Sequence, residues 1–288
     1  MNYDAVRNWR FADVEQTYTE KDTILYALGV GYGSDPLDEG QLRFVLENGL
    51  RAAPTMATTL GYSGFWQQDA ATGIDWRKLV AGETVLEMHA ALPVAATVVG
   101  RTRVTGVVDK GLDKGAIVYT ERTVSEKSSG KLLATFHGSI FCRGDGGMER
   151  SDPSPPWTAA PSAVPQGAPD AVCDLPTVPQ AALIYRLSGD RNPLHSEPAA
   201  ARAVGFDRPI LHGLATYGVV GHALLRTFCA YDPRRLASLS ARFSSPVVPG
   251  ETIRTEMWRR GSEVVCRSSS VERGVVVLSN CVAILRDI

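Results

Sequence analysis

Runs of β-branched and aromatic residues alternate with polar turns through the middle of the first half of the chain. Val, Thr, Ile and Tyr favour extended backbone, whereas Gly with charged residues favours turns, so the pattern predicts an antiparallel meander. The predicted strands span residues 83–92, 94–108, 116–125 and 131–142.

Two apolar segments that precede this meander predict helices. Residues 19–28 predict a helix that Asp22 caps and that Gly29 ends. Residues 50–60 predict a buried helix, with Pro54 near its start and small residues that allow another element to approach closely. The glycines after residue 28 follow no apolar strand and precede no Lys-Ser/Thr pair, which argues against a phosphate-binding loop.

The second half repeats the order of the first. The apolar segment at 181–187 comes first, followed by a short helix that Ser196 caps and Gly205 ends, and then by a longer helix from near His212 to about Cys229. Strand patterns follow at residues 237–243, 252–259, 264–271 and 275–285. Short sequences also recur, since VAGETV at 80–85 returns as VPGETI at 248–253, and ILYAL at 24–28 returns as LIYRL at 183–187. These matches predict a duplicated unit in which strands wrap a helix.

The composition between the two halves shifts to Pro, Ala, Ser and Gly. Such a segment disfavours helices and central strands, so it predicts an extended linker on the surface. We therefore divide the chain into a first repeat at 1–143, a linker at 144–180 and a second repeat at 181–288.

Composition narrows the class of protein. The chain has 288 residues, of which 44% are hydrophobic and 21% charged, as in a globular enzyme. It has no run of apolar residues long enough to cross a membrane and no apolar signal-peptide core at its start, which favours a cytoplasmic location. A net charge of −1 with interleaved signs argues against nucleic acid as a partner, and five scattered cysteines without a CxxC pair argue against disulfides and zinc.

The candidate chemistry lies in a short polar cluster formed by Asp190, Asn192 and His195 around Pro193. Each residue alone is a common turn former. Together, a turn at Pro193 can bring the carboxylate and the imidazole toward one point, where they could share a water as a general acid/base pair with Asn192 orienting them. Gly213 opens the following apolar helix, and its N–H can serve as an oxyanion site, although a glycine there can also simply permit tight packing.

These residues resemble the signature of the MaoC-like (R)-specific enoyl-CoA hydratases, or hydratase 2. The strongest similarity lies in YRLSGDRNPLH at 185–195 and GFDRPILHGL at 205–214. Weaker similarity extends over most of the chain, at residues 26–31, 108–111, 241–243 and 249–251. The chain is similar to the two-repeat form found in peroxisomal multifunctional enzyme type 2.

The resemblance implies an α+β double hot-dog fold with the active site in the second repeat. It places the catalytic acid and base on Asp190 and His195, the supporting amide on Asn192 and the oxyanion N–H on Gly213. It implies further contacts to the acyl-CoA thioester at Gly82, Lys110, Phe243, Arg191, Pro193 and Leu194. Lys114 in a second Asp-Lys-Gly is an alternative to Lys110, and Ala81 stands where the family often has His. No metal or cofactor is implied, and we expect a homodimer.

Two other functions compete with hydration. A hot-dog thioesterase would direct a carboxylate and water at the same carbonyl, and a non-catalytic subunit would only bind acyl-CoA. The Asp-x-Asn-Pro-x-His spacing argues against the first, and the complete acid, base and oxyanion set argues against the second. Acyl chain length and branching depend on the shape of the pocket, which the sequence does not fix.

Overall fold

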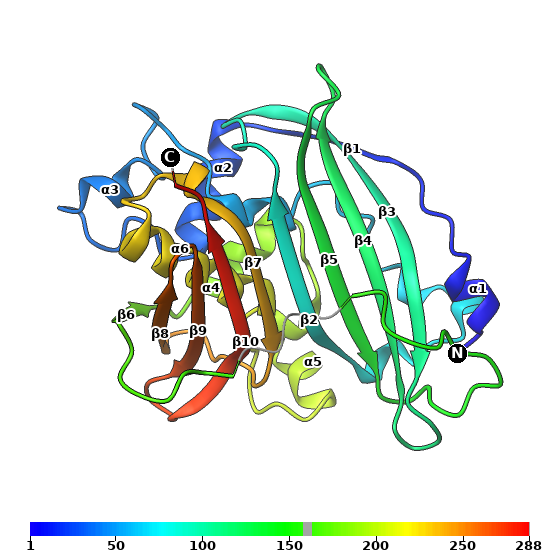
Figure 1. Ribbon diagram of the computed structural model, residues 1–288. Helices are drawn as coiled ribbons and strands as arrows, with labels where there is room; N and C mark the ends of the chain where they lie inside the picture. The colour runs from blue at the N-terminus through cyan, green and yellow to red at the C-terminus, as the bar shows by residue number, and fades with distance from the viewer. Residues whose placement is uncertain (158–162, 288) are drawn as a thin grey trace.

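A single antiparallel sheet of ten strands organises the structure, a computed structural model that describes residues 1–157 and 163–287 (Figure 1). The strand order is β1-β3-β4-β5-β2-β7-β10-β9-β8-β6. The strands of the first half are β1 (Val14–Tyr18), β2 (Leu79–Met88), β3 (Ala96–Asp109), β4 (Ala116–Glu126) and β5 (Leu132–Cys142). Those of the second half are β6 (Ala171–Pro176), β7 (Leu236–Phe243), β8 (Thr252–Arg260), β9 (Glu263–Ser270) and β10 (Val275–Leu285).

The two halves of the sheet have the same topology. Read from its outer edge inward, each half places its first strand at the edge, then its third, fourth and fifth strands, and then its second strand at the centre. The halves meet where β2 pairs with β7, and there Glu83 lies opposite Arg242 and accepts a 2.7 Å hydrogen bond from its Nε. The α+β fold of two sheet-forming repeats is therefore confirmed.

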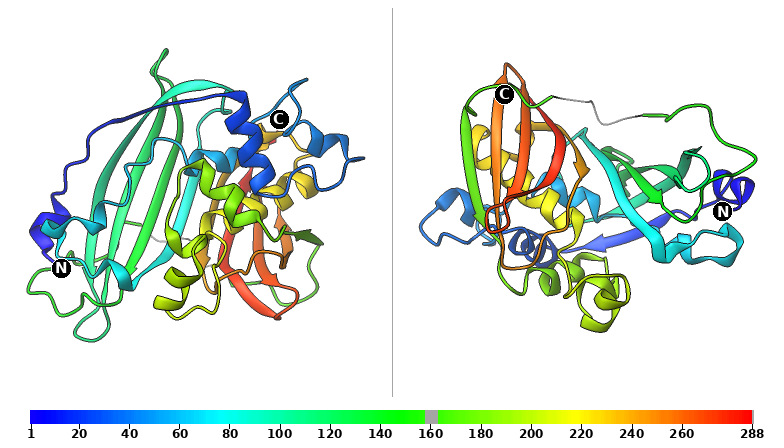
Figure 2. Two further views of the ribbon diagram at one scale, coloured as in Figure 1. Left: turned by 180° about the vertical axis from the view of Figure 1, so that it is seen from behind. Right: turned by 90° about the horizontal axis from the view of Figure 1, so that it is seen from below.

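The helices lie on one face of this sheet, as the rear view shows (Figure 2). The longest, α6 (Gly213–Phe228), is buried without interruption from Ala215 to Leu225, because apolar and small residues surround it. Shorter helices are α1 (Tyr3–Arg7), α2 (Glu20–Gly29), α3 (Glu39–Leu42), α4 (Ala181–Tyr185) and α5 (Pro198–Ala203). Among the described residues, no helix is both long and apolar enough to cross a membrane.

The predicted helix at 50–60 is wrong in its extent. Only a buried 3-10 turn, η1 (Pro54–Thr58), forms there. The hydroxyls of Thr58 and Thr59 donate to carbonyls within this turn, at 2.8 and 2.9 Å, and so compete with helical hydrogen bonds. Thr59 is the C-cap of this turn, and Gly61, two residues later, has φ 61°, where an added Cβ would lie 2.5 Å from Gly100 Cα. The first repeat thus has a short turn where the second has a helix of four turns.

Three smaller predictions also change. The cap of α2 is Thr19 rather than Asp22, which instead completes a capping box as the third helical residue. The N-cap of α5 is Glu197, not Ser196, because Pro198 takes the first helical position. Within the segment predicted as a linker, β6 pairs with β8 as an edge strand, and there Pro176 can be tolerated.

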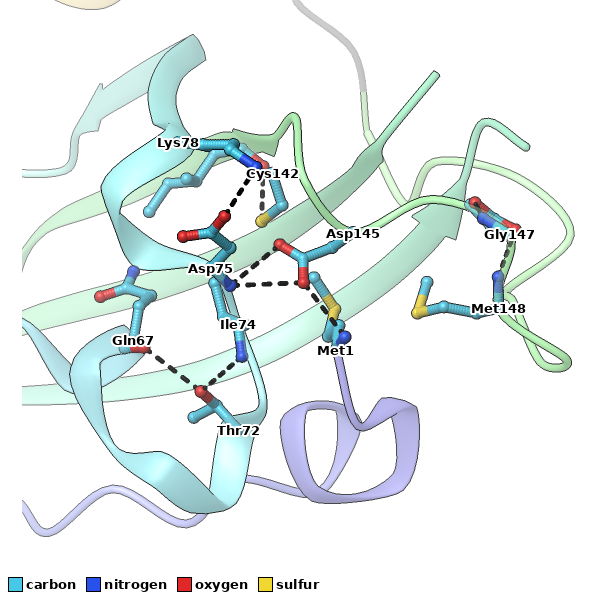
Figure 3. Close-up of polar contacts among 12 residues, drawn as sticks. Met1, Gln67, Thr72, Ile74, Asp75, Lys78, Cys142, Asp145, Gly147 and Met148 are labelled. Carbon is cyan, nitrogen blue, oxygen red and sulfur yellow. Dashed lines mark hydrogen bonds and ion pairs between the residues drawn. The ribbon is translucent and has the colours of Figure 1, made fainter. Parts of the chain in front are cut away.

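A second, smaller core lies at the outer end of the first repeat, away from α6. The Met1 amino group is 3.0 Å from Asp145 Oδ1, and the backbone N–H of Asp75 donates to both oxygens of the same carboxylate at 3.3 Å (Figure 3). Nearby, the Thr72 hydroxyl donates to Gln67 O at 3.2 Å. These contacts join the N-terminus and the loop before β2 to the segment that follows β5.

Acid will destabilise the fold through His222. This residue is fully buried on α6, and its ring stacks on that of Tyr32 with centroids 3.8 Å apart. Burial lowers the pKa of His222 to about 4. In the unfolded chain His222 is protonated near pH 6.5, whereas in the folded chain it is protonated only near pH 4. The free energy of unfolding therefore falls as the pH falls from about 6.5 to about 4. At roughly 1.4 kcal/mol per pKa unit, we expect a loss of up to about 3 kcal/mol from this residue.

Urea unfolding at pH 7 and pH 4.5 measures this loss. The variant His222→Phe keeps an aromatic ring against Tyr32 and should lose less free energy between the two pH values than the wild type. As a control, His89→Gln alters a histidine with an exposed side chain and should behave like the wild type. Equal losses in wild type and His222→Phe would contradict the assignment.

Candidate active site

The loop at residues 189–195 carries the polar cluster, and we call it the catalytic loop after its predicted role. Its own side chains shape it. The 3-10 turn η5 (Arg186–Ser188) ends at Gly189, whose φ of 128° only glycine adopts readily. The N–H of Asn192 then donates to Asp190 Oδ1 at 3.1 Å, and the N–H of Leu194 donates to Asn192 Oδ1 at 3.1 Å. Two successive side-chain turns therefore lead into η6 (Pro193–His195). Asn192 acts here by capping the turn that presents His195.

His195 is buried at the end of this turn and is held in one tautomer. Its Nδ1 lies 2.9 Å from the carbonyl oxygen of Ile210. A carbonyl only accepts, so Nδ1 carries the proton and Nε2 keeps its lone pair. Burial lowers the pKa of His195, and the Ile210 carbonyl and the Asp190 carboxylate only partly oppose this shift. The imidazole is therefore neutral at pH 7 and can accept a proton at Nε2.

His212 completes the cluster, although the sequence pattern indicated only a helix start near this residue. It lies immediately before α6, is 1% exposed, and stacks on the ring of His195 with centroids 3.8 Å apart. Its Nε2 donates to the backbone carbonyl of Asp190 at 3.1 Å. Burial, and then the neighbouring His195, lower its pKa to about 4. The signal in the sequence was a histidine directly before the candidate oxyanion glycine.

The predicted acid/base residues are brought together. One atom each of the Asp190 carboxylate, the His195 ring and the His212 ring lie within 4.8 Å of one another. Two hydrogen bonds of about 2.8 Å can bridge up to roughly 5.6 Å, so one water can contact both Asp190 and His195. The same three side chains are also the described group best placed to hold a metal ion, although two ring nitrogens already bond to carbonyls.

Gly213 is the first residue of α6, so its N–H is among those that have no partner within the helix. The side chain of His212, the N-cap residue, makes no capping hydrogen bond, which leaves this end of the helix open to a ligand oxygen. A Cβ at Gly213 would lie 3.0 Å from Cε1 of Phe243. The predicted pair Gly213 and Phe243 is thus in direct contact beside the catalytic loop.

The other residues predicted to contact the substrate are not members of the Asp190, His195 and His212 cluster. Gly82 lies in β2, where a Cβ would be 2.6 Å from Ser139 Oγ, so close strand packing explains the glycine. Lys110 and Lys114 are both exposed on the turn between β3 and β4, and the structure does not choose between them. On the catalytic loop, Arg191 and Pro193 are exposed and Leu194 is half-buried.

A cavity of about 130 Å³ opens beside the catalytic loop. Its wall combines Ser188 and Gly189 of the second repeat with Met56 and Leu60 around η1 and with residues of β1 and α2. Residues of both repeats therefore line this cavity, which reaches Gly189, the residue before Asp190.

Comparison with known proteins identifies the family of the chain. Residues 161–281 match the model of the MaoC like domain, and residues 16–144 match that of the MFE-2 hydratase 2 N-terminal domain. Enoyl-CoA hydratase 2, peroxisomal, from Arabidopsis thaliana is 36% identical over 98% of this chain and 95% of its own.

Solved structures give the same result. The MaoC-like dehydratase from Phytophthora capsici has a TM-score of 0.85 and 32% identity, and the match covers 100% of both chains. A Mycobacterium tuberculosis protein described as having a double hot-dog fold has a TM-score of 0.56 at 14% identity, with 96% of both chains covered. The fold is that of the MaoC-like double hot-dog proteins. The chain belongs to the MaoC-like enoyl-CoA hydratase 2 family.

Proposed function

We propose that this protein is a hydro-lyase that reversibly adds water to a trans-2-enoyl-CoA to give the (3R)-3-hydroxyacyl-CoA. The observation that carries the proposal is the approach of the Asp190 carboxylate and the His195 ring to within 4.8 Å, next to the open start of α6. The relative from Arabidopsis thaliana is named as an enoyl-CoA hydratase 2, which supports the same reaction class.

The proposed mechanism uses one water held between Asp190 and His195. One of the two groups accepts a proton from the water as its oxygen bonds to C3. The proton gained by the Asp190 and His195 pair is then delivered to C2 from the same face, which returns the pair to its starting protonation state. The Gly213 N–H, at the positive end of α6, stabilises the negative charge that develops on the thioester oxygen. The thioester itself takes up the electrons, so the proposed reaction requires no metal or redox cofactor.

The two repeats divide the work in this proposal. Residues 181–288 supply the acid/base pair and the oxyanion N–H, whereas residues 1–143 accommodate the acyl chain. The cavity whose wall includes Met56 and Leu60 of the first repeat supports this division.

The location and assembly of the protein are also proposals. The five cysteines are free and buried, which supports a reducing compartment such as the cytoplasm, although the Arabidopsis relative is named as peroxisomal. Acyl-CoA is the proposed partner. The homodimer stays a prediction that sedimentation equilibrium can test.

Purified protein incubated with crotonyl-CoA tests the reaction. Hydration removes the ultraviolet absorbance of the conjugated thioester without releasing thiol, and chiral analysis should return the 3R product. Release of free CoA would instead identify a thioesterase. Binding of enoyl-CoA without turnover would identify a non-catalytic subunit.

A further inference from the structure

A buried arginine in the first repeat has no role in the mechanism above. Arg122 lies in β4 with only 5% of its surface exposed. Its Nη2 donates to the carbonyl of Thr58 in η1 at 2.5 Å. Its guanidinium lies 5.1 Å from the ring centroid of Phe136 and 5.7 Å from that of Tyr62. The side chain therefore lies on the face of the sheet that η1 covers.

The charge of Arg122 is not neutralised by the described part of the chain. No carboxylate of a described residue forms an ion pair with it, and its Nε has no hydrogen-bond partner there. The arginine on the neighbouring strand behaves differently, since Arg103 is exposed and pairs with Glu121 at 2.8 Å. Burial lowers the pKa of Arg122 to about 10, so it stays cationic at pH 7. A buried unpaired cation is destabilising, which indicates that an anion from outside the chain completes the site.

Arg122 faces the catalytic loop across two tyrosines. Loss of solvent and then the Asp190 carboxylate raise the pKa of Tyr62 to about 12, and the Arg122 charge partly opposes that shift. Tyr185 is fully buried, and its pKa is likewise raised by the Asp190 charge and lowered by the Arg122 charge. Both phenols therefore lie within electrostatic range of Asp190 and of Arg122. The carbonyl that Arg122 contacts belongs to Thr58 of η1, and Met56 of the same turn lines the cavity beside the catalytic loop. The guanidinium therefore lies against the turn that borders the proposed acyl-chain space.

We propose that Arg122 forms a subsite for a carboxylate carried by the acyl chain, so that the enzyme prefers enoyl-CoA thioesters whose acyl group ends in a carboxylate. The inference rests on the proposed function, because it assigns the substrate class of the same active site. A carboxylate is planar and accepts two parallel hydrogen bonds, which matches the Nε and Nη donors of a guanidinium. It would also supply the missing partner for Nε.

Paired substrates test this inference. Each pair has one chain length and differs only at the far end, which is either a methyl group or a carboxylate, and several lengths are compared. We expect the wild type to show at least about 10-fold higher kcat/KM for the carboxylate member at one length, because a site built for polar contacts discriminates strongly. Arg122→Met should remove most of this preference, and Arg122→Lys should keep part of it. The control Arg103→Met should keep it in full.

Three outcomes would overturn the inference. They are a wild type without preference at any length, an Arg122→Met variant that folds and keeps the preference, and an Arg103→Met control that loses it equally. If Arg122→Met does not fold by circular dichroism, the wild-type series and Arg122→Lys decide. A wild type that hydrates no enoyl-CoA, crotonyl-CoA included, would instead contradict the proposed function, so the two failures are distinguishable.

Discussion

Replacing Asp190 by Asn will lower kcat/KM for the hydration of crotonyl-CoA by about 10²–10⁴, the usual contribution of a general acid or base. The amide keeps the size of the carboxylate and its oxygen can still accept from the N–H of Asn192, as Asp190 Oδ1 does at 3.1 Å. The turn that presents His195 should therefore persist. What the variant loses is the negative charge and the ability to take up a proton beside the water.

Stability and activity must be measured together for this variant. We expect the urea midpoint of Asp190→Asn to stay close to that of the wild type while turnover collapses. Asp13→Asn is the matched control, because it removes an aspartate whose only described ion pair is an exposed contact with Arg101 on the first repeat. It should keep wild-type turnover. A rate within about 10-fold of wild type in a folded Asp190→Asn protein would exclude Asp190 as the acid or base.

Much of the catalytic loop could be predicted from the sequence because its geometry is local. The spacing from Asp190 to His195 contains Asn192 and Pro193, whose turn-forming properties act over two or three residues. The structure realises this through hydrogen bonds between residues two apart in the chain. The strands were predictable for a related reason. A strand in a half-buried sheet alternates buried and exposed positions, and this alternation is visible in the sequence.

Contacts between distant segments could not be predicted in this way. His212 bonds to a carbonyl 22 residues earlier in the chain, and its stacking on His195 appears only once α6 packs against the loop. The predicted helix at 50–60 is reduced to η1, and the chain that follows it lies close to β3 at Gly61 and Gly100, a contact between distant segments. Arg122 occupies a strand position whose burial follows from the turn that covers it.

His195→Gln provides the second decisive test, and its effect should equal that of Asp190→Asn within an order of magnitude. Glutamine can still donate to the Ile210 carbonyl, which His195 contacts at 2.9 Å, but it cannot carry a proton between water and C2. We expect kcat/KM to fall by about 10²–10⁴. The double variant should be little slower than either single one, because groups that act on one water do not contribute additively.

The dependence of kcat/KM on pH distinguishes a loss of proton transfer at His195 from a disruption of the active-site structure. Burial lowers the pKa of His195 below its ordinary value of 6.5, so the ring is neutral at pH 7 and gains a proton only in more acidic solution. A reaction that needs the Nε2 lone pair will then have constant kcat/KM around neutral pH and lose activity as the pH falls below 6.5. His195→Gln should lose this acid limb along with the rate, whereas His89→Gln should keep both. An unchanged acid limb in the residual activity of His195→Gln would mean that another group, with His212 the nearest candidate, sets it.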